Sequence, residues 1–319
     1  MLDARPDQSV SLSSLPAGAS LRSLLVELNT AAGALAALTA AFEARAAGHA
    51  LAPGLATAVS GVLDALGVRE PLAELPPGEL EALLAELRVF AASHGRLAAP
   101  VPPEPGWASA SPELIQAAGA VSAGLPRFLE RAVVPRLAGL SERLGARGAR
   151  FLDIGAGAGA LSIQMARTWP ELAVVGIEPW APALQLARAN VHAAGLEQRI
   201  ELRAERGERL ADESSYELAW IPAFFVAEPL LDVVLGRVRR ALRADAWLLL
   251  PVLRAEASAL AASVVRLRTA LWGGSALTLG EAAARLAAAG FIDLQSFAST
   301  PTSATGLLAA RAGQSALSC

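Results

Sequence analysis

Lysine is absent from the 319 residues, so all 27 basic side chains are arginines. This excludes chemistry that needs a lysine amine, such as Schiff-base catalysis, the phosphate-loop lysine or a catalytic tyrosine–lysine pair. Cysteine occurs once, at Cys319, and histidine three times, which excludes a disulfide framework and Cys/His metal clusters. The 30 acidic residues give a net charge of −3, so we expect no broad basic surface and no nucleic-acid partner.

Aromatic residues make up only 5% of the chain, and the 54% hydrophobic content is mostly Ala and Leu. The longest charge-free stretches, such as 28–42, are interrupted by Gly, Thr and Asn, so we expect no membrane span of about 20 strongly apolar residues. The first ten residues carry charges before any apolar run, unlike a signal peptide. We therefore expect a soluble, cytoplasmic protein without a membrane partner.

Its composition and hydrophobic periodicity divide the chain into a flexible tail (1–20), a helical domain (21–144) and an α/β domain (145–319). Leu and Ala recur at helical spacing before residue 145, and proline-rich residues 96–112 predict a stiff linker. The expected N-terminal helices are 21–47, 55–66, 79–93 and a broken stretch over 111–144. The expected strands are 150–154, 172–178, 199–205, 216–222, 246–252, 292–299 and 306–312. Helices between these strands predict a doubly wound parallel sheet.

The most informative motif is the run from Phe151 to Ala160, in which a strand ends at Ile154 and a Gly/Ala-rich turn leads into a helix. Glycines at 155 and 157 let a ligand approach the backbone N–H groups. Glu178 ends the next strand, where its carboxylate can accept hydrogen bonds from both ribose hydroxyls. We expect this carboxylate to lie at an open strand end. The pattern predicts a nucleoside-type site.

The glycine motif alone also fits a dinucleotide, so the cofactor has to be chosen on other grounds. Asp153 would repel a pyrophosphate but suits a ligand that carries an amino group. The sole tyrosine, Tyr216, lies at the start of a strand and not on a catalytic helix. The chain also finishes with two successive strands instead of a separate catalytic domain. These features favour S-adenosylmethionine over a nicotinamide cofactor.

From about Leu144 to Ala312, the sequence resembles the class I S-adenosylmethionine-dependent methyltransferases. The resemblance rests on the runs LDIGAGAG (152–159), VGIEP (175–179), LARAN (186–190), AGL (194–196), YELAWIP (216–222) and AAGF (288–291). It implies a seven-stranded, mostly parallel sheet with the last strand antiparallel. The helical N-terminal region looks like the cap of small-molecule members, a substrate-binding region and a candidate homodimer interface.

The resemblance also implies the cofactor contacts. Gly155, Ala156 and Gly157 would line the methionine part and Asp153 would hold its amino group, directly or through water. The other implied contacts are Glu178 on the ribose, Pro179 and Trp180 beside the adenine, and Ile221 and Pro222 under the sulfonium. The family's frequent Gly-Asp pair after the third strand is replaced by Ala204-Glu205-Arg206, so Glu205 is the substitute for binding the adenine amino group.

The sequence indicates fewer residues for the methyl acceptor than for the cofactor. The segment 223–242 has no histidine, so Glu228 and Asp232 are the nearest candidates for a general base after the fourth strand. Glu228 fits a helix N-terminal charge at least as well. Phe224 and Phe225 are candidates for an apolar substrate wall, with core packing as the rival interpretation.

The predicted function is methylation, at oxygen or carbon, of a small and fairly apolar metabolite of secondary-metabolite biosynthesis. Two alternatives stay open: a non-methylating use of the cofactor, as in a cyclase or decarboxylase, and a non-catalytic cofactor-binding subunit. The sequence predicts no metal site.

Overall fold

The computed structural model describes residues 20–99, 101, 104–298 and 303–313. The expected tail (1–20) therefore lies outside the described residues except for Ser20, and Cys319 lies outside them as well. The chain forms two compact units, residues 1–80 and residues 81–319. A helical domain that ends at residue 144 stays a prediction.

The first unit contains α1, Leu21–Ala47, α2, Pro53–Ala65, and α3, Arg69–Glu74, and it includes the start of α4, Pro77–Leu97. The Ser20 side chain caps α1 by accepting from Ser23 N, and Gly48, at φ 65°, ends the helix in the left-handed conformation. The sequence pattern predicted α1 and α2 but missed the short α3. It also made α4 too short, because that helix runs on to Leu97.

Helix α1 corrects the expectation that no segment is apolar enough for a membrane span. It has 27 residues and an 18-residue window of mean hydropathy 1.5, none of which is buried. By length and composition alone α1 could cross a membrane. A single helix of this kind near the N-terminus is weak evidence for a span, since signal sequences pass the same test.

The second unit is built around a seven-stranded sheet in the order β3-β2-β1-β4-β5-β7-β6. Strand β7 is antiparallel to both of its neighbours, and the other pairings are parallel. The strands are β1, Arg150–Ile154, β2, Ala173–Ile177, β3, Ile200–Arg203, β4, Tyr216–Trp220, β5, Leu242–Leu253, β6, Phe291–Phe297, and β7, Thr305–Ala312. This confirms the predicted doubly wound fold with an antiparallel last strand.

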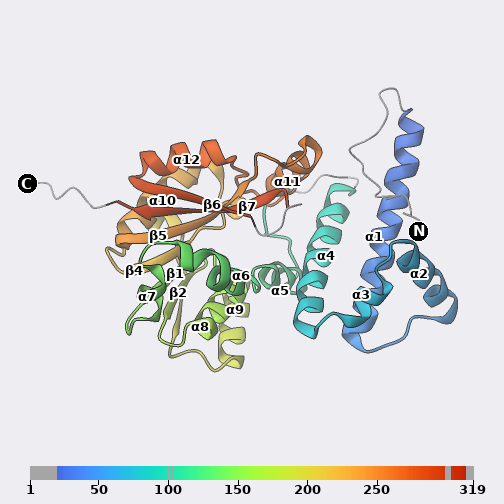
Figure 1. Cartoon of the computed structure of the whole chain (residues 1–319), viewed down its shortest axis with the longest axis horizontal. Helices are drawn as coiled ribbons and strands as arrows, with labels where there is room; N and C mark the ends of the chain where they lie inside the picture. The colour runs from blue at the N-terminus through green and yellow to red at the C-terminus, as the bar shows by residue number, and fades with distance from the viewer. Residues whose placement is uncertain (1–19, 100, 102–103, 299–302, 314–319) are drawn as a thin grey trace, which may run out of the picture. The chain divides into compact units, whose positions relative to one another are not determined.

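Helices cover both faces of this sheet (Figure 1). The helices of this unit that follow α4 are α5, Pro112–Val121, α6, Leu125–Phe128, α7, Leu140–Gly145, α8, Ala160–Thr168, α9, Ala181–Ala193, α10, Glu228–Ala241, α11, Ala259–Leu271, and α12, Leu279–Ala288. The expected stretch over 111–144 is divided into α5, α6, a π-helical turn (Leu129–Val133), a 3-10 turn (Val134–Arg136) and α7. Pro126 and Pro135 lie in the broken region, as their missing N–H groups predict.

Alternation along the strands divides the core into two layers. On β1, Leu152 and Ile154 belong to the cluster that packs against α10 and α12. Phe151, on the opposite face, belongs to the cluster that includes residues of α7 and α8. Because both faces are buried, the β1 register is strongly specified, and the turn after Ile154 is held at the carboxyl edge of the sheet.

Candidate active site

The turn between β1 and α8 is built on glycines. Gly155, Gly157 and Gly159 have φ angles of 68°, 56° and 78°, a region that side chains rarely adopt. The backbone N–H groups of Gly155 and Ala156 donate to the Ile177 carbonyl at 2.9 and 3.0 Å, which joins this turn to the end of β2. At Gly159 a Cβ would lie 3.3 Å from the Ala187 Cβ, so α8 can approach α9 closely only because this position is glycine.

Glu178 joins the same turn to the loop after β2. Its Oε2 accepts from Gly157 N and its Oε1 accepts from Trp180 N, both at 2.9 Å. The residue is only 8% exposed, and burial raises the pKa of its carboxyl although the two backbone bonds act against this. This corrects the expectation of an open carboxylate at a free strand end, because Glu178 is part of the local structure.

Asp153, on β1, is a second buried carboxyl. It is 1% exposed, and its Oδ2 accepts from the Ser162 hydroxyl of α8 at 2.6 Å. Burial raises the pKa of Asp153 to about 7, the Ser162 hydrogen bond lowers it, and the nearby Glu178 charge adds to the rise. A cation placed beside Asp153 would stabilise the ionised form.

These residues line a cavity of about 640 Å³ at the carboxyl ends of the strands. This volume is in the usual range for small-molecule sites, about 300–1,000 Å³. The cavity brings together most of the predicted site residues: Asp153, Gly155, Ala156, Gly157, Glu178, Pro179, Trp180, Glu205, Pro222, Phe224 and Phe225. Ile221 is the exception among the predicted cofactor contacts. It is fully buried in the core behind this wall, and its N–H donates to the Leu249 carbonyl.

Glu228 and Asp232 do not lie in this cavity. Both lie on α10, pair at 2.9 Å with the Arg285 guanidinium of α12, and are largely exposed. Glu228 instead lines a separate hollow of about 230 Å³. The placement argues against either residue as a general base, because their carboxylates are held by Arg285 away from the cavity.

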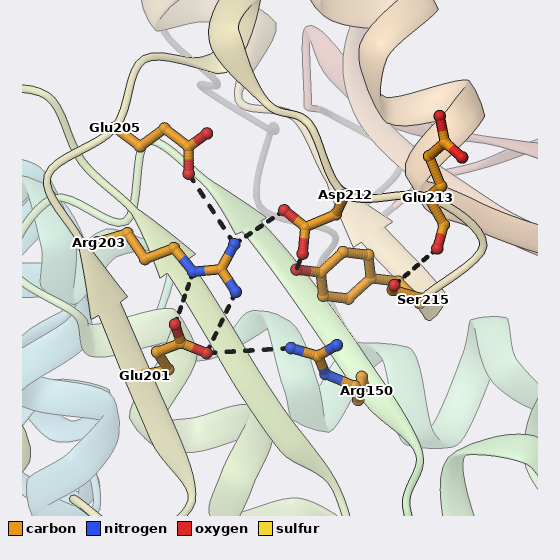
Figure 2. Close-up of polar contacts among 8 residues, drawn as sticks. Arg150, Glu201, Arg203, Glu205, Asp212, Glu213 and Ser215 are labelled. Atoms are coloured by element: carbon orange, nitrogen blue, oxygen red, sulfur yellow. Dashed lines mark hydrogen bonds and ion pairs between the residues drawn. The ribbon is translucent and has the colours of Figure 1, made fainter.

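Glu205 follows β3 and reaches the cavity beside a cluster of charged groups (Figure 2). The Arg203 guanidinium bonds to Glu201 at 2.7 Å and Asp212 at 2.8 Å, and its Nη1 lies 3.9 Å from Glu205 Oε2. The Tyr216 hydroxyl donates to Asp212 at 3.0 Å, and burial raises the pKa of Tyr216. Tyr216 therefore stays protonated and serves as a hydrogen-bond donor in this cluster.

Several lining residues had no signal in the sequence analysis. Trp107 comes from the proline-rich segment before α5, and Ile115 and Val121 come from α5 itself. Trp220 and Pro251 lie on the neighbouring strands β4 and β5. The parallel register of these two strands would have indicated Trp220, because side chains at the carboxyl end of a central strand face a ligand crevice. No local pattern marks Trp107.

Comparison with known proteins agrees with this geometry. Residues 151–245 match the family described as a methyltransferase domain. The chain contains a class I S-adenosylmethionine-dependent methyltransferase domain. S-adenosylmethionine is accordingly its cofactor. No curated protein matches the chain significantly.

Solved structures share the fold of this methyltransferase over most of the chain. An O-methyltransferase family protein from Burkholderia thailandensis has a TM-score of 0.63 at 16% identity and covers 93% of this chain and 99% of its own. Human N-acetylserotonin methyltransferase has a TM-score of 0.61 at 15% identity, and the match covers 94% of this chain and 100% of the human one. Mitomycin 7-O-methyltransferase has a TM-score of 0.58 at 15% identity, and the match covers 92% of this chain and 98% of that enzyme.

Replacing Glu178 by alanine should weaken both the fold and cofactor binding. It leaves the Gly157 and Trp180 N–H groups without their carboxylate, which should lower the free energy of unfolding of the ligand-free protein by about 1–3 kcal/mol. Cofactor affinity should fall by about 1.5–3 kcal/mol. Urea unfolding and calorimetric titration measure the two effects. Exposed Glu171, replaced by alanine, is the control and should change neither. An unchanged midpoint for Glu178→Ala would contradict the structural role.

Asp153→Asn should stabilise the ligand-free protein above neutral pH. The native pKa of about 7 lies above the unfolded value of 3.8, so the native state binds more protons between these values. Its free energy of unfolding therefore falls as pH rises through this window. Asparagine does not ionise, so the variant does not lose stability in this way. Its free energy of unfolding relative to the wild type should therefore rise by about 2–3 kcal/mol from pH 5 to pH 8. Urea unfolding at both pH values tests this, and parallel pH profiles would show that Asp153 is not protonated near neutrality.

Proposed function

We propose that this methyltransferase transfers the methyl group to an oxygen or carbon of a small, flat and fairly apolar metabolite. The observation that supports this is the composition of the 640 Å³ cavity. The glycine turn and the buried carboxyls Asp153 and Glu178 lie in its wall, and so do the aromatic side chains of Trp107 and Phe225. One cavity can therefore hold the cofactor and an apolar acceptor together.

The cofactor half fits the methionine and ribose parts. The Asp153 carboxyl would receive the amino group, with Gly155, Ala156 and Gly157 along the methionine chain. Each Glu178 oxygen accepts one backbone N–H and keeps a lone pair, so the carboxylate can also accept from the ribose hydroxyls.

The remaining contacts belong to the adenine and the sulfonium. Pro179 and Trp180 follow Glu178 in the cavity wall and would lie beside the adenine, with Glu205 as acceptor for its amino group. Pro222 is the wall residue for the sulfonium, and it lies close to Gly155, where an added Cβ would be 3.5 Å from the proline ring. Ile221 supports Pro222 from the core instead of touching the ligand.

The acceptor half offers no evident base. The ionisable residues among the described cavity lining are Asp153, Glu178, Glu205, Arg206 and Glu208, which lie on or after β1, β2 and β3. None of these lining residues is a histidine; His94 and His192 are exposed elsewhere. This composition favours an acceptor that ionises readily, such as an acidic phenol or an enol.

The bound cofactor supplies a methyl group on a positively charged sulfur, which is a good leaving group. The chain has to align the acceptor atom with that methyl group and exclude water from the apolar half of the cavity. Because the acceptor half offers no evident base, the acceptor would have to release its proton to solvent before the methyl group is transferred.

Calorimetry and a transfer assay test the proposal. S-adenosylmethionine and S-adenosylhomocysteine should bind with micromolar-range affinity, about −8 kcal/mol, while NADH gives no heat. With radiolabelled cofactor, acidic hydroxynaphthoquinones should be methylated faster than cyclohexanol. Cofactor binding without transfer to any planar hydroxyl compound in such a panel would contradict the proposed acceptor class.

Glu228→Gln should leave turnover within about twofold of the wild type, because the Arg285-paired carboxylate lies outside the cavity. Loss of a true general base costs about 10²–10⁴-fold. Steady-state kinetics with the best acceptor of the panel measures this. A hundredfold lower turnover in Glu228→Gln, with normal cofactor affinity, would show that Glu228 reaches the acceptor.

A further inference from the structure

Three aromatic rings form a packed group at the acceptor half of the cavity. The Trp107 ring stacks on Trp272 with centroids 4.2 Å apart and an interplanar angle of 22°. The Phe225 ring meets Trp107 edge-on at 5.4 Å and 74°. Trp107 and Phe225 line the cavity, whereas Trp272, on which the Trp107 ring stacks, is buried and is not among the lining residues. Trp107 thus offers the cavity a flat ring, held between Trp272 and Phe225, that suits a planar ligand.

Two members of this group are fixed by their own backbone. The turn after α11 packs on the turn after β4, since a Cβ at Gly274 would lie 1.8 Å from the Phe224 carbonyl oxygen. Ser275 bonds to this second turn twice, from its N–H to the Ala223 carbonyl at 2.9 Å and from its hydroxyl to the Val226 carbonyl at 2.8 Å. These contacts hold Phe225 and Trp272 in place.

Trp107 is held differently, through the side chain of Arg96 at the end of α4. The Arg96 guanidinium donates to the Gly106 carbonyl at 2.8 Å and to the Glu104 carbonyl at 2.9 Å. Its carbon centre lies 4.5 Å from the Trp272 ring centroid, a cation–π contact. One side chain thus contacts the backbone that carries Trp107 and the ring on which Trp107 stacks.

Other contacts support the same arrangement. Gly106 N donates to the Leu271 carbonyl at 3.0 Å, which ties the Trp107 segment to the end of α11. The Trp272 ring N–H donates to the Ser93 hydroxyl, one turn before Arg96 on α4, at 3.2 Å. A solvated arginine that only completes the α4 C-terminus would bond to the carbonyls of α4, whereas these two guanidinium bonds go to residues beyond the helix.

We propose that Arg96 is a positioning residue for the methyl acceptor: it holds Trp107 stacked on Trp272 and so forms the flat wall that selects planar, apolar ring compounds. This inference rests on the proposed function. It adds a determinant of acceptor selectivity that does not touch the acceptor. A planar guanidinium is needed, because only a fork of donors can bond to two carbonyls while its face lies on a ring.

The test compares Arg96→Met and Arg96→Lys with Trp107→Leu, and with Arg147→Met as an exposed-arginine control. Stacked indoles give an exciton couplet in circular dichroism. The couplet should be present in the wild type and in Arg147→Met, absent in Trp107→Leu and strongly reduced in both Arg96 variants. A couplet unchanged in Arg96→Met overturns the proposal. If that variant does not fold, Arg96→Lys decides by the same criterion.

Ligand binding provides the functional readout. With S-adenosylhomocysteine bound, 1-naphthol affinity should fall about tenfold in Arg96→Met and Trp107→Leu, as expected for a lost aromatic contact. S-adenosylhomocysteine affinity should stay within twofold, which separates a local effect from general damage. No 1-naphthol binding by the wild type, or equal binding by the variants, overturns the proposal. Normal binding of both ligands without methyl transfer would instead overturn the proposed function alone.

Discussion

One buried carboxylate joins the ends of two neighbouring strands, and the cofactor half of the cavity depends on it. Glu178 accepts from Gly157 N in the turn after β1 and from Trp180 N in the loop after β2. The glycine turn has positive φ angles and few side-chain contacts of its own, so without this carboxylate its conformation would cost more entropy to fix. The residue to which the proposed function assigns the ribose therefore also builds the turn beside it.

The two buried carboxyls of the cofactor half favour a ligand that carries positive charge. Asp153 and Glu178 are both buried, and the charge of Glu178 raises the pKa of Asp153. A pyrophosphate at this place would add further negative charge beside two buried carboxyls, where negative charge is already unfavourable. A ligand with an amino group and a sulfonium relieves the penalty, since a nearby cation favours the ionised carboxyl. Under the proposed function, the stability that these buried carboxyls cost the free protein would be regained when the cofactor binds.

The cofactor half could be predicted from the sequence because its determinants are local. Glycines at fixed spacing after a buried strand, and an acid at the end of the next strand, specify positions relative to the sheet edge without any distant contact. The candidate base Glu228 was expected at the same edge. The sequence placed it near the end of β4, but the tight turn Ala223–Phe225 comes between, and Arg285 of α12 binds its carboxylate on the outside.

Apart from Phe224 and Phe225, the acceptor half could not be predicted, because its other contacts join distant parts of the chain. Ser93 and Trp272, for example, are 179 positions apart and meet through one hydrogen bond. Trp107 lies in a proline-rich segment whose composition predicts only a linker, and its place depends on Arg96 and Trp272. The two halves therefore respond differently to substitution. A change at Trp107 or Arg96 alters the acceptor wall while the β1–α8 turn keeps its own hydrogen bonds, so acceptor selectivity can change in this fold without loss of cofactor binding.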